Sequence, residues 1–125
     1  MHRSTEDLAL KIEAPGTQIR AVEDWNGISI GYIQLPAGTD LGPMLEGLPN
    51  DACPVEHWGY VVAGQITVKS AEGATEELKA GDVYFLPPGH TGVTKDGVTF
   101  IEFSPQAKFK TVLSHLMQKA GASAG

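Results

Sequence analysis

The chain has 125 residues and a formal net charge of −6. A chain of this length supports one hydrophobic core, and its nine Lys and Arg residues are too few and too dispersed for a nucleic-acid surface. No apolar run approaches the roughly 20 residues of a membrane-spanning helix, and the first residues lack the apolar core of a signal peptide. We therefore expect one cytoplasmic domain that binds neither nucleic acid nor a membrane.

The content of turn-forming residues indicates an all-β protein. Fifteen Gly and eight Pro are many for a helical domain and suit short strands joined by tight turns. Cys53 is the only cysteine, which excludes an intrachain disulfide and a Cys-x-x-Cys metal site.

The first third of the chain predicts an edge strand, a hairpin and a loop. Alternating apolar residues between 8 and 12 suggest a short edge strand, or an arm exchanged between two copies. Residues 18–23 and 28–35 flank Asn26-Gly27, a strong signal for a hairpin with a type I′ turn. Residues 36–50 contain three Gly and three Pro, so we expect a long loop across one mouth of a barrel.

The middle of the chain predicts further strands at regular spacing. Residues 57–63 form one apolar run, and 65–69 with 75–78 suggest a hairpin. A strand over 83–86 follows, and we expect another hairpin to turn at 95–97 into the last strand. This spacing is typical of a barrel or sandwich.

A helix is predicted at the end of the chain. Ser104 supplies an N-cap and Pro105 a first-turn proline. The apolar residues beyond them recur with helical spacing, at Phe109, Val112, Leu113, Leu116 and Met117. We expect the helix to cover about 105–119 and to pack on the outside of the barrel.

Four turn positions carry a family resemblance. Gly64 closes the first apolar run, and Gly81, Pro87 and Gly89 frame the strand over 83–86. Their spacing resembles the two sequence motifs of the cupin superfamily, over about a third of the chain. The resemblance implies an antiparallel β-barrel or jelly roll, the double-stranded β-helix of cupins, with a C-terminal α-helix. It implies a single cupin domain over 1–125 with a core at about 17–104.

The metal-binding positions of the cupin motifs are altered here. Counting back from the first glycine places His57 where the motif has Glu, and Cys53 and Asp51 where it has two histidines. Gly92 takes the histidine position of the second motif, and His90 lies two residues earlier. The resemblance thus implies Asp51, Cys53, His57 and His90 as candidate ligands of a divalent metal, Zn or Fe.

A structural interpretation of the same residues stays open. His57 could be a hydrogen-bonded core histidine and Cys53 a small buried hydrophobe. Two residues four apart on a straight strand lie about 13 Å apart, so Cys53 can approach His57 only if Pro54 bends the chain. We expect that bend, with His57 pointing into the barrel and His90 nearby.

Glu102 is a further candidate for the barrel interior. It lies between Ile101 and Phe103, and a carboxylate facing the lumen is costly unless a ligand or metal pairs with it. We therefore predict His57, His90 and Glu102 as ligand-binding residues. Glu56 alternates with His57, so an exposed position is expected for it.

Strand alternation sends Trp58 and Tyr60 to the face opposite His57. There they would pack on a second sheet, the C-terminal helix or a second copy of the chain. Together with the edge strand near the N-terminus, this favours a homodimer.

The resemblance implies a cupin domain protein that binds a small polar molecule in its barrel, with or without a divalent metal. The alternative is a metal-dependent enzyme, an isomerase, lyase or hydrolase, acting on a small metabolite. A barrel that only binds a protein partner is a third, weaker hypothesis. The fold alone cannot choose among them.

Overall fold

The computed structural model describes residues 1–124. Short 3₁₀ turns occur at Thr5–Asp7 and Pro49–Asp51. The strands and α-helices are β1 (Ala9–Ala14), β2 (Thr17–Trp25), β3 (Ile28–Leu35), β4 (Thr39–Asp40), α1 (Gly42–Leu45), β5 (His57–Lys69), β6 (Thr75–Lys79), β7 (Val83–Leu86), β8 (Thr91–Thr94), β9 (Val98–Pro105) and α2 (Gln106–Ala124).

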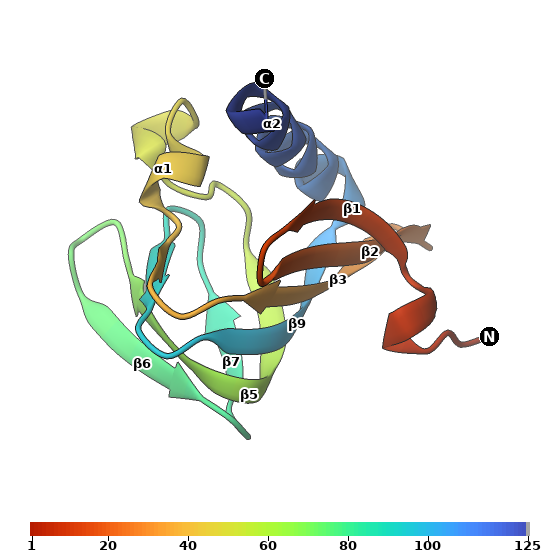
Figure 1. Cartoon of the computed structure of the whole chain (residues 1–125), viewed down its shortest axis with the longest axis horizontal. Coiled ribbons are helices and arrows are strands. Elements are labelled where there is room, and N and C mark those ends of the chain that lie inside the picture. Colours follow the sequence, from red (N-terminus) through yellow and green to blue (C-terminus); the bar gives the residue numbers. More distant parts are fainter. Residues whose placement is uncertain (125) are drawn as a thin grey trace.

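The strands form one antiparallel sheet that curls on itself (Figure 1). Their order is β1-β2-β3-β9-β5-β8-β4, with β6 and β7 also paired to β5. In Figure 1, β1–β3 lie on one side of the molecule, and β5–β7 lie on the other. The predicted all-β fold with a C-terminal helix is confirmed. β1 is an edge strand, paired with β2.

β5 belongs to both halves of the curled sheet. Its first part, through Gly64, pairs with β7 and β9, and its second part pairs with β6 and β8. Gly64 has a φ of +76°, and a Cβ there would lie 2.1 Å from the carbonyl oxygen of Gly97. The sequence predicted a strand that stops before Gly64, but β5 continues to Lys69 because glycine allows the bend without ending the strand.

Two predicted turns have different outcomes. Asn26 and Gly27 have φ angles of 53° and 90°, so the hairpin between β2 and β3 is confirmed. The predicted hairpin at 95–97 is wrong, since β8 pairs with β4 and β5 but not with β9. The hydroxyl of Thr94 donates to the carbonyl of Gln65 and accepts from the amide of Gly97, which holds this turn against β5.

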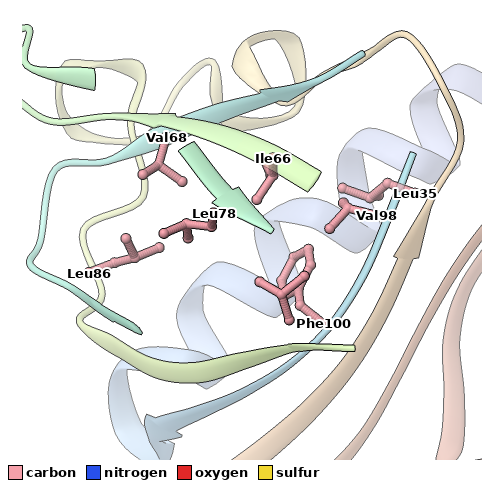
Figure 2. Close-up of a cluster of buried hydrophobic side chains, with 8 residues drawn as sticks. Leu35, Ile66, Val68, Leu78, Leu86, Val98 and Phe100 are labelled. Carbon is pink, nitrogen blue, oxygen red and sulfur yellow. The ribbon is translucent and has the colours of Figure 1, made fainter. Parts of the chain in front are cut away.

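The hydrophobic core lies between the two halves of the sheet (Figure 2). The figure shows side chains from β3, β5, β6, β7 and β9 pointing into this space. Its buried members are Leu35, Val61, Ile66, Val68, Leu78, Leu86, Val98 and Phe100.

The helices lie together at one end of the molecule (Figure 1). The predicted loop over 36–50 contains β4, α1 and a 3₁₀ turn. α2 begins at Gln106, because Ser104 and Pro105 are still part of β9, so the predicted N-cap at Ser104 is wrong. Instead of ending near 119, α2 continues to Ala124. In the described residues 1–124, no helix is long and apolar enough to cross a membrane.

Candidate functional site

Cys53 is held next to His90 by backbone hydrogen bonds. The amide of Cys53 donates to the carbonyl of His90 at 2.9 Å, and its carbonyl accepts from the amide of Gly89 at 2.7 Å. The chain then bends through residues 54–56 before β5 begins at His57. As a result Cys53 Sγ lies 3.3 Å from His57 Nε2, a distance that a straight strand could not give.

The ring of His57 is fixed from its other side. Its Nδ1 lies 2.6 Å from Ser104 Oγ and 3.5 Å from Glu102 Oε2. Burial lowers the pKa of His57 to about 4, although the charge of Glu56 acts in the opposite direction. At neutral pH the ring is therefore uncharged, and its contact with Glu102 is not an ion pair.

His90 is oriented in the same way. Its Nδ1 lies 2.8 Å from the carbonyl oxygen of Pro87, and since a carbonyl can only accept, Nδ1 carries the hydrogen. Nε2 is then the unprotonated nitrogen of the neutral ring. Burial lowers the pKa of His90, and its ring centroid lies 5.0 Å from that of His57.

Glu102 forms the acidic side of the site. The hydroxyl of Tyr84 donates to Glu102 Oε1 at 2.8 Å. Burial raises the pKa of Glu102 to about 7, while the Tyr84 hydrogen bond and the charge of His90 oppose that shift. Tyr84 has room because its strand neighbour is Gly59, where a Cβ would lie 2.4 Å from the phenol oxygen.

A cavity of about 120 Å³ adjoins these residues. α1 and α2 close one end of it, so α2 covers the end of the barrel and not the outer face that we expected. The helical part of its wall consists of Met44, Leu45, Phe109, Val112, Leu113 and Leu116.

The structure brings together three of the four predicted metal ligands. One potential ligand atom from each of Cys53, His57 and His90 lies within 4.8 Å of the others, and all three residues are buried. Asp51 does not join them. It is exposed, with a φ of 53°, and its carboxylate accepts a hydrogen bond from the amide of Gly47.

Three further predictions concern residues near His57. Glu102 faces the cavity beside His57. Glu56 points away and binds Lys108 Nζ of α2 at 3.2 Å, but it is half-buried and not exposed as expected. Trp58 and Tyr60 are 48% and 43% exposed, on the face opposite His57.

Sequence reasoning missed Ser104 and Tyr84. Ser104 lies two residues after Glu102 on β9, so strand alternation would have placed both on the same face. The signal was outweighed by the Ser-Pro pair, which suggested a helix cap. Tyr84 lies opposite Gly59, a pairing that becomes visible only once the register of β5 and β7 is known.

The donor set fits a divalent metal. One sulfur and two imidazole nitrogens are typical zinc ligands, and three protein ligands leave a coordination position open. Both histidines have Nδ1 bonded to a fixed oxygen, the arrangement that orients Nε2 towards a metal. Without a metal, burial raises the pKa of the Cys53 thiol to about 12, so an ion would have to displace its proton.

Comparisons with known proteins agree with this fold. Residues 50–102, which include Cys53, His57, His90 and Glu102, match a family model described as an EutQ-like cupin domain. No curated protein sequence matches the chain significantly.

Solved structures of similar shape include an RmlC-like cupin from Shewanella frigidimarina. It is 20% identical with a TM-score of 0.62, and the match covers 87% of this chain and 93% of that one. A protein of unknown function from Rhizobium leguminosarum is 19% identical with a TM-score of 0.65, covering 84% and 95%. A putative ethanolamine utilization protein Q from Salmonella typhimurium is 21% identical with a TM-score of 0.54, covering 77% and 78%.

At these identities the structural likeness concerns the fold alone. The spacing of the turn residues, the curled antiparallel sheet and the match to the cupin family model nevertheless point the same way. The chain has the fold of a cupin, and its residues 50–102 match the EutQ-like cupin family model.

Proposed function

We propose that this cupin binds a small molecule in its barrel cavity at a divalent metal ion held by Cys53, His57 and His90. The observation that carries the proposal is the convergence of these three buried donors next to the cavity. A bound metal would supply a Lewis acid able to polarise a ligand oxygen or nitrogen. The sulfur and nitrogen donors favour zinc over harder ions such as magnesium.

Metal analysis of untagged protein tests this proposal. We expect purified protein to carry zinc or iron, or to take up either ion at neutral pH. His57→Ala removes the central ligand and should lower metal affinity by more than the roughly 10- to 100-fold typical of losing an outer partner. Ser104→Ala removes such an outer partner and should lower affinity by about tenfold.

His2→Ala is the matched control, since His2 is exposed near the N-terminus and should leave metal content unchanged. A protein that carries no metal and binds neither Zn²⁺ nor Fe²⁺ would exclude the metal site. His57 would then act as a core histidine bonded to Ser104.

Glu102 supports a second candidate, a metal-dependent enzyme of the isomerase, lyase or hydrolase type. A buried carboxyl with a pKa near 7 can hold or release a proton at neutral pH, as a general acid or base must. If the protein converts a molecule that it binds, Glu102→Gln should keep affinity for that molecule and lose turnover. Equal turnover in the variant would exclude this role.

A further inference from the structure

The titratable groups that line the cavity form one cluster around His57. Cys53 Sγ lies 3.3 Å from Nε2 of this ring, and Glu102 Oε2 lies 3.5 Å from its Nδ1. The ring centroid of His90 lies 5.0 Å from that of His57. Tyr84 extends the cluster through its 2.8 Å hydrogen bond to Glu102. A ligand can therefore find its polar partners at one place in the cavity.

The wall formed by α1 and α2 is apolar. Every described residue that these helices contribute to the lining has a hydrocarbon or thioether side chain. Met44, Phe109 and Leu116 of this wall keep part of their surface accessible, whereas Leu78 and Phe100 of the barrel core are buried. The free space of the cavity therefore adjoins the helices. A polar group placed there would lose its hydrogen bonds to water without replacement.

Cys53 connects the donor cluster to the helical wall. It packs in one buried cluster with Leu45 of α1 and Val112 of α2. A ligand atom bound to a metal at this sulfur would thus start beside the helices. Among the cavity-lining residues that the structure describes, none is a lysine or arginine, so the metal would also supply the positive charge for an acidic group.

We infer that the ligand is a small amphiphile, with a metal-coordinating oxygen or nitrogen group at one end and an apolar body that packs against α1 and α2. The inference rests on the proposed function, because it places the coordinating group on the metal. The cavity of about 120 Å³ is comparable with an apolar cavity of about 150 Å³ that binds benzene, so the body has about four to six carbon atoms.

Three carboxylates test the inference on the full untagged chain loaded with cobalt(II), which accepts the same nitrogen and sulfur ligands as zinc. Acetate has the coordinating group without the body, and pentanoate has both. Glutarate has the length of pentanoate but carries a second carboxylate at its far end. The visible absorption of the bound cobalt reports binding, since a ligand that joins the metal changes its coordination.

We expect pentanoate to bind at least about tenfold more tightly than acetate, because each further buried methylene group contributes about fourfold. Glutarate should bind no more tightly than acetate, because its second carboxylate would have to lie against the apolar wall.

Phe109→Ala locates the apolar body. The substitution lengthens the cavity at the helical wall, so heptanoate should bind the variant about tenfold more tightly than it binds the parent, while acetate binding stays unchanged. Met117→Ala is the matched control. Met117 is an apolar residue of the same helix that is 45% exposed and does not line the cavity, so its substitution should change neither affinity.

The cobalt spectrum separates this inference from the metal proposal. Protein that binds cobalt through the thiolate but binds acetate and pentanoate equally, binds glutarate as tightly as pentanoate, or binds no probe would overturn the inference alone. Protein without a thiolate-to-cobalt absorption band would refute the proposed function and the inference with it. Preference for pentanoate, with a heptanoate affinity that responds to Phe109 and not to Met117, would support the inference.

Discussion

At the scale of single residues, the interior of the barrel contains two groups whose titrations oppose one another. Burial raises the pKa of Glu102 from 4.5 to about 7 and lowers the pKa of His57 from 6.5 to about 4. Cys53, Tyr84 and His90 are the other titratable groups that face them. Each shift favours the uncharged form, since both groups lie in a largely apolar space.

The two shifts change stability in opposite directions. Folded Glu102 keeps a proton that the unfolded chain releases, so its contribution to stability falls as the pH rises from about 4.5 to about 7. His57 stays neutral in the folded state while the unfolded chain binds a proton, so its contribution rises between pH 4 and pH 6.5. In metal-free protein the two effects largely cancel.

Glu102→Gln should therefore reveal the effect of His57. We expect the free energy of unfolding of the variant to increase with pH between 4.5 and 6.5 more steeply than that of the parent, by up to about 3 kcal/mol over the window. Urea denaturation at several pH values with a chelator measures this. Glu72→Gln, in an exposed turn, should follow the parent. Parallel curves for the parent and Glu102→Gln would contradict the prediction.

The candidate site shows which residues a sequence can place. Local alternation and motif spacing brought His57, His90 and Glu102 into consideration, and the structure gathers them around one cavity. Asp51 does not reach this cavity, because its positive φ turns the chain and its carboxylate accepts a hydrogen bond from the amide of nearby Gly47. Ser104 could be predicted as a site residue only if β9 was known to continue that far, and the local sequence does not determine where β9 ends.

At the scale of elements, β5 determines how the sheet closes. It pairs with β7 and β9 before Gly64 and with β6 and β8 after it. At this bend the backbone of β5 approaches Gly97 closely, so the position tolerates neither a Cβ nor an ordinary φ. One glycine thus connects the two halves of the barrel.

Gly64→Ala should destabilise the protein by at least about 3 kcal/mol, because positive φ is costly for alanine and the new Cβ would collide with the carbonyl of Gly97. Gly73→Ala is the matched control. Gly73 has a φ of +88° but no neighbouring atom within 4 Å, so its substitution should cost only about 1–2 kcal/mol. Chemical denaturation of both variants compares these costs, and equal losses would show that the close approach to Gly97 is unimportant.

Elements were predictable where the signal was local. The Asn26-Gly27 turn needs only its own two residues, so its hairpin could be read directly. The turn at 95–97 has similar residues, yet Thr94 binds it to Gln65, 29 positions away in the sequence, and β8 and β9 separate. The apolar stripe of α2 was visible, but which part of the barrel it covers depends on α1 and the cavity.

At the scale of the whole molecule, one outer face of the sheet is apolar and exposed. It extends over β7, β5, β9 and β3, whose pairing places Phe85, Trp58 and Phe103 side by side. The rings of Trp58 and Phe85 lie 5.3 Å apart. We call this surface the aromatic face, consisting of Ile28, Trp58, Tyr60, Val62, Val83, Phe85 and Phe103, each at least 40% exposed.

We propose that the aromatic face pairs with the same face of a second copy. Contiguous exposed apolar patches commonly mark interaction sites, and because the members of the aromatic face carry no charge, two copies can meet without like charges facing each other. Light scattering at a concentration on the order of tens of micromolar should give the mass of a dimer.

Trp58→Ser should shift the measured mass to that of the monomer, since a central tryptophan commonly contributes about 2 kcal/mol or more to an interface. Val93→Ser removes an equally exposed apolar residue on β8, outside the aromatic face, and should leave the dimer intact. A parent protein that is monomeric under these conditions would refute the proposal, because the face would then remain exposed to water at the concentration where pairing should bury it.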